Sequence, residues 1–173
     1  MKQILIIDDD SDMCKLLGNF LQRKGFDAVT SQTGHKGIEK FKENFFDVVL
    51  CDFRLGDMDG RKVLQEIKAI KPGVVFIFIT GYSDLRMAVE VIKNGAFDYI
   101  TKPLIPEEVI NVINSGLAEL NASNEHGSAT NSTVESRLKN IILQIMKNFL
   151  LVLRRKQLNC ISKLNWWRLP ITV

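Results

Sequence analysis

The first 120 residues alternate between two hydrophobic patterns. Short runs of consecutive apolar, often β-branched residues are typical of strands buried on both faces of a parallel sheet. Between these runs, apolar residues recur every three or four positions, as on one face of a helix. The predicted strands are 3–7, 26–30, 48–52, 74–79 and 97–101. The first predicted helix carries an apolar stripe from Met13 to Leu21 and ends before Gly25, and the third carries Val63, Leu64 and Ile67 and ends at Pro72. The other predicted helices are 37–44, about 83–94 and 106–120. Five such units with short connections predict an α/β fold, a (βα)5 doubly wound parallel five-stranded sheet.

Glycine, proline and acidic residues mark the predicted helix ends. Gly25 and Gly95 follow two of the helical stretches, where glycine adopts the left-handed terminating conformation at little cost. Pro106 is tolerated in the first turn of the last helix. Asp10, with Ser11 and Asp12 after it, suits the start of the first helix, so we assign Asp10 to a helix cap.

Charge divides the chain into two parts. Residues 1–120 contain 15 Lys and Arg against 18 Asp and Glu, whereas residues 121–173 contain 8 against 2. The second part opens with a stretch rich in Asn, Ser, Thr and Gly, a composition typical of flexible linkers. We therefore expect a globular domain over 1–120, a linker over 121–140 and a basic, apolar tail over 141–173.

Cysteine usage and hydropathy indicate a cytoplasmic protein. The three cysteines are an odd number without metal-type CxxC spacing, which fits free thiols in a reducing compartment. The apolar run near the N-terminus is too short for a signal peptide, and no run of 18 apolar residues occurs. We expect no membrane association.

Acidic residues follow two of the predicted strands. Asp8, Asp9 and Asp10 come after the first strand, and Asp52 ends the third. In open α/β sheets, ligands bind beyond the carboxyl ends of the strands. Each acid taken alone could equally be a cap or a solvated turn residue. Two strands that end in acids predict a shared cation.

Four motifs carry a resemblance to a known family. In order they are IIDDD, LCDFRLGDMDG, FITGYSD and GAFDYITKPL. Residues 1 to about 120 resemble the receiver domain of two-component response regulators, which has the CheY-like, flavodoxin-like fold. The resemblance implies a sheet order of 2-1-3-4-5, with the site at the point where the strand order reverses.

The resemblance also implies a role for each acidic residue. Asp52 would accept a phosphoryl group from a sensor histidine kinase, since carboxylates act as nucleophiles in phosphoryl chemistry. Asp8, Asp9, Asp52 and the backbone carbonyl of Arg54 would hold Mg²⁺, a cation that prefers oxygen ligands. The chain would then be a phosphoacceptor with self-phosphorylation and self-dephosphorylation chemistry only, and no enzyme.

The remaining motif residues would bind the phosphoryl group and transmit its presence. Lys102 would place its ammonium on the phosphoryl oxygens, and Pro103 suggests a cis peptide that aims Lys102 inward. Thr80 would hydrogen-bond the phosphoryl group, with Gly81 leaving room for the backbone. Tyr99 would turn inward as Thr80 moves. The switching face would be residues 81–99.

Part of the chain resembles one class of receivers in particular. The stretch GYSDLRMAVEVIKNGAFDYITKPL is similar to receivers of NtrC-type regulators, which act with a sigma factor in transcription. The resemblance implies a truncated transcriptional regulator that can form a homodimer through residues 81–120. The chain contains no GxxxxGK[ST] phosphate loop, and we expect no direct nucleic acid binding. Gly56 stands where receivers often carry proline, which loosens the loop after Asp52.

The sequence lacks the motifs of two other functions and leaves a third open. A haloacid-dehalogenase-like phosphatase needs a second Asp two residues after its nucleophile, where this chain has Arg54. A dinucleotide-binding domain needs GxGxxG after the first strand, where this chain has DDDSDM. A stand-alone receiver that acts through a protein partner remains open as the alternative.

The tail has two interpretations. Arg154, Arg155 and Lys156 after an apolar helical stripe are typical of a basic amphipathic helix that binds a membrane surface or a partner. Alternatively, the tail is a frameshifted or truncated remnant of an output domain. Trp has the single codon TGG, and read from the third base the codons around Trp166 and Trp167 can encode QIELVAPT, an acidic or amide residue, Tyr and Ser. This sequence resembles the opening of the NtrC-type ATPase domain, so the coding DNA distinguishes the two interpretations.

Overall fold

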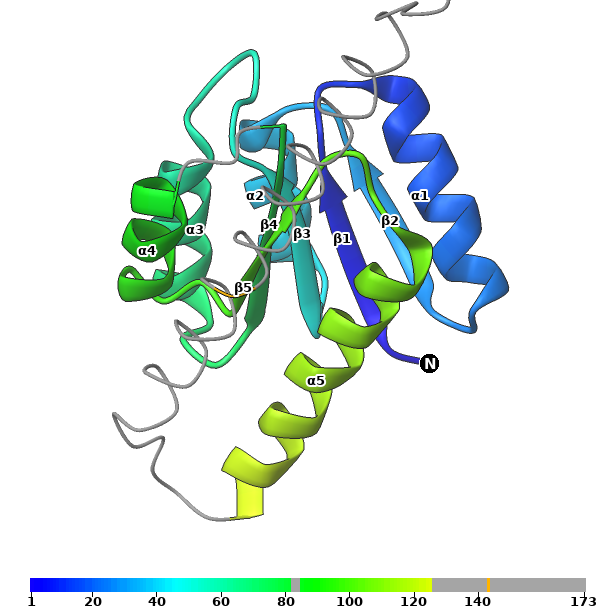
Figure 1. Cartoon of the computed structure of the whole chain (residues 1–173), viewed down its shortest axis with the longest axis vertical. Helices are drawn as coiled ribbons and strands as arrows, with labels where there is room; N and C mark the ends of the chain where they lie inside the picture. The colour runs from blue at the N-terminus through cyan, green and yellow to red at the C-terminus, as the bar shows by residue number, and fades with distance from the viewer. Residues whose placement is uncertain (82–84, 126–142, 144–173) are drawn as a thin grey trace, which may run out of the picture.

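Five parallel strands form one sheet in the order β2-β1-β3-β4-β5 in a computed structural model that describes residues 1–81, 85–125 and 143 (Figure 1). The strands are β1 (Gln3–Ile7), β2 (Asp27–Ser31), β3 (Val48–Asp52), β4 (Val75–Thr80) and β5 (Asp98–Thr101). All four strand pairs are parallel. This is the order that the resemblance implied, and the predicted fold class is confirmed.

Helices cover both faces of the sheet. They are α1 (Ser11–Arg23), α2 (Gly34–Glu43), α3 (Gly60–Ile70), α4 (Leu85–Lys93) and α5 (Pro106–Glu125). In Figure 1, α1 and α5 lie on one side of the sheet and α3 and α4 on the other. Because successive strand residues point to opposite faces, β1 supplies Leu5 and Ile7 to the core beneath α2, α3 and α4, and Ile4 and Ile6 to the core beneath α1 and α5.

Capping residues fix where three of the helices begin. Asp10 accepts hydrogen bonds from the backbone N–H groups of Asp12 and Met13, which confirms its assignment as a helix cap. Thr33 caps α2 and Asp59 caps α3 in the same way. The caps satisfy N–H groups that have no partner within the helix. Gly25 and Gly95 both have positive φ, +87° and +97°, as expected for glycines that end helices.

Some boundaries differ from the sequence prediction. α2 begins at Gly34, three residues before the predicted start, because Thr33 caps it. α5 continues to Glu125, so five residues of the predicted linker are helical. Residues 83 and 84, predicted to open the fourth helix, lie outside the described residues. So do linker residues 126–140 and, apart from Leu143, the tail at 141–173.

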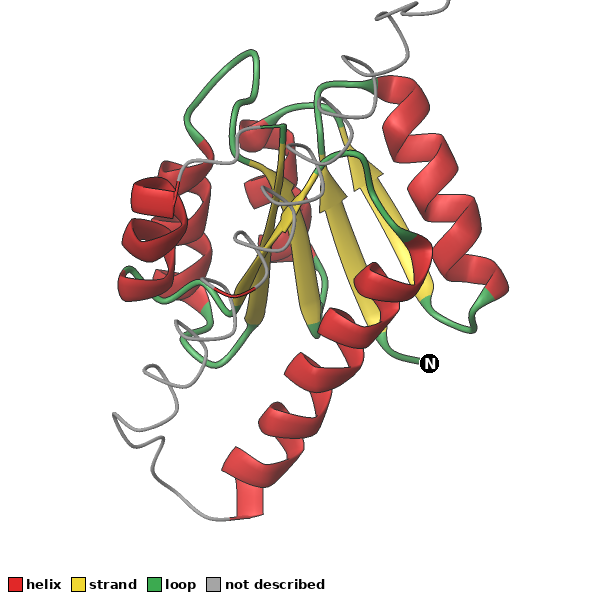
Figure 2. Ribbon diagram, in the orientation of Figure 1, coloured by secondary structure: helices red, strands yellow, loops and turns green. Residues whose placement is uncertain are grey.

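The topology brings the predicted site residues to one edge. The carboxyl ends of all five strands lie at the top of Figure 2. The order of the strands makes β3 a neighbour of both β1 and β4, and β4 a neighbour of β5. The register pairs Ile7 with Cys51, and Thr80 with Thr101. Residues that directly follow or end these strands therefore meet at the same edge.

Within the part of the chain that the structure describes, no helix combines the length and apolar character needed to cross a membrane.

Candidate functional site

Lys102 connects the acids of two neighbouring strands. Asp8 follows β1 and Asp52 ends β3, and these strands are paired. The Lys102 ammonium nitrogen lies 2.8 Å from Asp8 Oδ2 and 2.7 Å from Asp52 Oδ2. A single cation thus bridges the two carboxylates, and hydrogen bonds of this charged kind are stronger than neutral ones.

Asp9 completes an acidic cluster at the same edge. One carboxylate oxygen from each of Asp8, Asp9 and Asp52 lies within 4.8 Å of the others. Asp8 is 2% exposed, whereas Asp9 is exposed, so the cluster spans the boundary between core and solvent. Three carboxylates offer the hard oxygen ligands that Mg²⁺ prefers, so the residues present fit this ion.

Burial and hydrogen bonding shift the pKa of each partner of the bridge in opposite directions. Burial raises the pKa of the Asp8 carboxyl, and the hydrogen bonds from Lys102 and the Asp10 backbone only partly offset that increase. Burial also opposes the charged form of Lys102, but its hydrogen bonds to Asp52 and Asp8 outweigh burial and raise its pKa. Lys102 therefore stays an ammonium group, which keeps a fixed positive charge beside the carboxylates.

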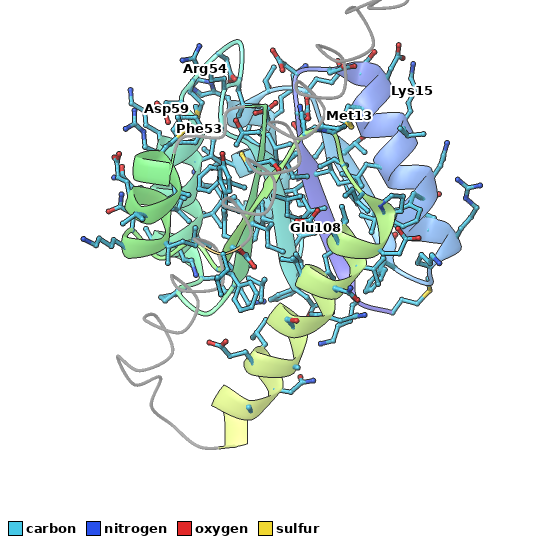
Figure 3. The ribbon with its side chains drawn as sticks, in the orientation of Figure 1. Met13, Lys15, Phe53, Arg54, Asp59 and Glu108 are labelled. Atoms are coloured by element: carbon cyan, nitrogen blue, oxygen red, sulfur yellow. The ribbon has the colours of Figure 1, made fainter. Side chains whose placement is uncertain are left out.

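The loop between β3 and α3 lies against the acidic cluster. The Arg54 backbone N–H donates to Asp52 Oδ1 over 3.2 Å. A side chain built on Gly56 would come 3.9 Å from Asp9 Oδ2. Arg54 and Asp59 form an isolated antiparallel bridge, and Gly60 N–H donates to the Phe53 carbonyl. Figure 3 shows Phe53, Arg54 and Asp59 together at this end of the molecule, on the side of α3 and α4.

The other predicted site residues gather around the same edge. Thr80 is the buried last residue of β4, and its carbonyl accepts the Lys102 backbone N–H over 2.8 Å. Gly81 follows it and is exposed. The peptide bond between Lys102 and Pro103 is cis, as predicted. Tyr99 is buried in the core beneath α2, α3 and α4, together with Ala88 and Val91 of α4.

Sequence reasoning missed a set of contacts on α3 and α4. The Arg61 guanidinium binds Asp59 and the Glu90 carboxylate, and lies 5.5 Å from the centre of the Phe53 ring. These residues line a cavity of about 470 Å³ together with Leu55, Met58 and Met87. Glu90 lies within the predicted switching face of residues 81–99, but no sequence signal paired it with Arg61, because the two are 29 positions apart and belong to different helices.

A second missed contact joins the β3–α3 loop to α2. Asp57 accepts backbone hydrogen bonds from Gly34 and His35 and a third bond from the His35 ring. Asp57 had no assigned role, since its partners lie more than 20 positions away in the sequence.

Comparisons with known proteins give a consistent result. Residues 4–114 match the family described as "Response regulator receiver domain". The transcriptional regulatory protein ZraR of Escherichia coli strain K12 is 42% identical over 101 residues, which are 58% of this chain and 23% of ZraR. The chain thus spans about a quarter of the length of this curated relative.

Two solved structures show the same fold at more than 30% identity. A CheY-like receiver domain protein from Methanospirillum hungatei JF-1 has a TM-score of 0.68 and 32% identity, over 71% of this chain and 98% of that one. The beryllofluoride-activated NtrC4 receiver domain dimer has a TM-score of 0.67 and 32% identity, over 69% and 99%.

Proposed function

The chain belongs to the response regulator receiver domain family, and from this premise we propose that Asp52 accepts a phosphoryl group from a sensor histidine kinase. The receiver is similar to those of NtrC-type regulators. The observation that carries the proposal is the Lys102 ammonium between Asp8 and Asp52, at the carboxyl ends of central strands. A phosphoryl group transferred there would meet a nucleophile and a cation together.

Asp52 would act as the nucleophile. A carboxylate oxygen of Asp52 attacks phosphorus, an O–P bond forms, and the P–N bond to the kinase histidine breaks. The leaving imidazole nitrogen keeps the electron pair of that bond and takes a proton from solvent. Asp52 enters the reaction positioned by the Arg54 N–H on one oxygen and by Lys102 on the other. Lys102 can then follow the new charge, because its flexible stem allows the ammonium to reach the phosphoryl oxygens.

Asp8, Asp9, Asp52 and the Arg54 carbonyl would hold Mg²⁺. When bound, the ion supplies positive charge that offsets the negative charge on the phosphoryl oxygens. The two carboxylates other than Asp52 remain available to hold the ion after Asp52 has become an acyl phosphate. Their placement on either side of the solvent boundary fits an ion that keeps several of its waters.

Thr80 and Tyr99 would transmit phosphorylation to the 81–99 face. The Thr80 hydroxyl would bind a phosphoryl oxygen. Gly81 would allow the backbone after Thr80 to move, and Pro103 would keep the Lys102 side chain oriented toward the site. Tyr99 shares its core with α4, so a change at Thr80 can alter how that helix packs. The phosphoryl group would bias an equilibrium between two arrangements of α4 and β5.

Wider roles follow from the relatives. We propose that the receiver regulates transcription as part of an NtrC-type response regulator in the cytoplasm. We also propose that it forms a homodimer through residues 81–120, as the NtrC4 receiver is a dimer in its activated form. The chain itself would be a phosphoacceptor that catalyses only its own phosphorylation and dephosphorylation.

Intact mass after incubation with a small phosphodonor tests the proposal. We expect a gain of one phosphoryl group that requires both Mg²⁺ and Asp52. The Asp52→Asn variant should gain nothing, and Asp27→Asn, which changes an exposed acid at the start of β2, should gain it normally. An unmodified wild-type protein that is shown to be folded would refute phosphoryl acceptance at Asp52.

A further inference from the structure

Asp57 lies in the β3–α3 loop and binds the N-terminus of α2. Its Oδ1 accepts the Gly34 backbone N–H over 2.9 Å, and its Oδ2 accepts the His35 backbone N–H over 3.0 Å. The His35 ring nitrogen Nδ1 lies 2.7 Å from Oδ2. An ionised carboxylate can only accept hydrogen bonds, so Nδ1 carries the proton in this contact. Both oxygens of Asp57 are therefore occupied by donors of α2.

The contact satisfies a need of α2 that its own residues leave unmet. Thr33 accepts the Lys36 N–H with its side chain and the Gly37 N–H with its carbonyl. Gly34 and His35 are the first two helical residues, and their N–H groups have no partner within the helix. The negative charge of Asp57 also lies at the positive end of the helix dipole. Partial burial raises the pKa of Asp57, but the hydrogen bonds from His35 and Gly34 outweigh burial and lower it to about 2.

Packing reinforces this contact. A Cβ at Gly34 would lie 2.5 Å from Met58 Cγ, so a larger residue there would displace the Met58 side chain of the loop. Met58 packs against the core that α2 and α3 share. The residues on either side of Asp57 thus lie between α2, which Met58 approaches, and the acidic cluster, since a Cβ on Gly56 would lie 3.9 Å from Asp9 Oδ2.

The loop needs such an anchor because of its composition. Gly56 gives the backbone before Asp57 more conformational freedom than other residues would. The base of the loop is closed by the bridge between Arg54 and Asp59 and by the hydrogen bond from Gly60 to Phe53. Residues 55–58 form its tip, and Asp57 ties that tip to a helix that packs on β1, the strand leading to Asp8.

We propose that Asp57 is a positioning residue: by binding the N-terminus of α2 it holds the β3–α3 loop, and with it the Arg54 carbonyl, against the Asp8, Asp9 and Asp52 cluster. The inference rests on the proposed function, since it concerns the same Mg²⁺ site. Asp57 touches neither the ion nor the phosphoryl group in this role. It acts through the loop backbone, as groups behind metal ligands commonly do.

Mg²⁺ affinity separates positioning from simple stabilisation. If Asp57 only stabilises the fold, its replacement lowers the melting temperature of the protein and leaves the dissociation constant for Mg²⁺ in the folded state unchanged. If Asp57 positions the loop, its replacement also raises that dissociation constant. The dissociation constant is measured by calorimetric titration of the unphosphorylated full-length protein with MgCl₂, well below the melting temperature of each variant.

We expect Asp57→Ala to raise the dissociation constant for Mg²⁺ by about tenfold, the low end of the range for groups that orient metal ligands. Asp57→Asn keeps one acceptor oxygen and should fall between Asp57→Ala and the wild type. At saturating MgCl₂, both variants should accept the phosphoryl group from a small phosphodonor at close to the wild-type rate. The effect is then one on affinity rather than on the reaction itself.

Asp47→Asn is the matched control. Asp47 also accepts one backbone N–H, from Gln3, and one side-chain hydrogen bond, from Lys2, but it precedes β3 and lies at the opposite edge of the sheet. The Asp47→Asn substitution should lower the melting temperature without changing Mg²⁺ affinity. If Asp57→Ala and Asp57→Asn bind Mg²⁺ like the wild type, the positioning role is wrong and the proposed function stands. If the folded wild type binds no Mg²⁺, the metal site of the proposed function fails, and the positioning role with it.

Discussion

At the scale of single residues, Lys102 interacts with two carboxylates at once. It neutralises Asp8, which is almost fully buried, and it occupies the oxygen of Asp52 that faces it. A buried charged group that loses its partner costs more free energy than the pair contributes net. The same ammonium also repels any second cation placed among these carboxylates. Stability without metal and affinity for metal therefore depend on Lys102 in opposite ways.

Replacing Lys102 by methionine should separate these two effects. We expect Lys102→Met to lower the free energy of unfolding by about 2 kcal/mol in the absence of metal, because the Asp8 carboxyl loses its charged partner. Added MgCl₂ should then raise the melting temperature more in the variant than in the wild type, since the ion no longer competes with an ammonium. Thermal unfolding with and without MgCl₂ measures both.

Lys15→Met serves as the control for this experiment. Lys15 pairs with Asp12 on the exposed surface of α1, so its loss should change neither the free energy of unfolding nor the response to MgCl₂. An equal MgCl₂ response in Lys102→Met and the wild type would contradict competition between Lys102 and the ion.

Gly60 shows how closely the backbone packs behind Asp52. A Cβ at this position would lie 2.6 Å from the Asp52 carbonyl oxygen and 3.0 Å from that of Phe53. These are backbone atoms of β3 and its following loop, so they can move only if the strand end moves. We expect Gly60→Ala to lower the free energy of unfolding by about 1–3 kcal/mol, the usual cost of overpacking, in urea unfolding experiments.

Gly73→Ala is the matched substitution for Gly60→Ala. A Cβ at Gly73 would meet nothing within 4 Å, so its free energy of unfolding should stay within about 0.5 kcal/mol of the wild type. Equal losses in the two variants would mean that the intrinsic backbone preference of glycine, rather than the close approach at Asp52, sets the cost.

At the scale of elements, Arg61 links α3 to α4. It binds Asp59 through two nitrogens, contacts the Phe53 ring, and reaches Glu90 on α4 over 3.0 Å. The hydrogen bonds to Asp59 and Glu90 raise the pKa of Arg61, so its guanidinium stays charged at every pH at which the protein is folded. α4 belongs to the face that we propose to switch. The contact to Glu90 is the part of this network that a movement of α4 would break.

Glu90 and Arg61, the two ends of this network, should contribute differently to the free energy of unfolding. Glu90 is 51% exposed, so Glu90→Gln should lower the free energy of unfolding by less than about 1 kcal/mol, with a smaller loss at high salt. Arg61→Ala should cost more, because it also removes the contacts with Asp59 and Phe53. Urea unfolding at low and high salt measures both. Equal effects of the two variants would mean that the Asp59 and Phe53 contacts do not stabilise the protein.

Elements were predictable where local sequence decides them. Unbroken apolar runs predicted the first, third and fourth strands, because a strand buried on both faces admits little else. The second and fifth predicted strands each contain an aspartate, Asp27 and Asp98, and their patterns are correspondingly weaker. The sequence predicts an end of α5 that is too early, since Asn, Ser and Ala after Leu120 are as typical of a linker as of a helix end. The apolar spacing predicts a start of α2 that is too late, although Thr33 is a capping signal in the sequence.

The site was predictable only in part, for a reason that applies to the whole molecule. Asp8, Asp9, Asp52, Thr80 and Lys102 stand at strand ends, and a parallel sheet brings such ends together whatever the details of packing. Asp57, Arg61 and Glu90 stand in a loop and on helices, and their partners depend on how those elements pack. No pattern along the chain encodes the 2.7 Å contact between His35 and Asp57.

The bridge formed by Lys102 also ties the completion of the acidic cluster to the completion of folding. Asp8 and Lys102 are 94 positions apart in the chain. A nascent chain that has emerged from the ribosome only as far as β4 already carries Asp8, Asp9 and Asp52, but it lacks the cation that belongs with them. The site at which we propose phosphoryl acceptance is therefore complete only after β5 has been synthesised and has docked on β4.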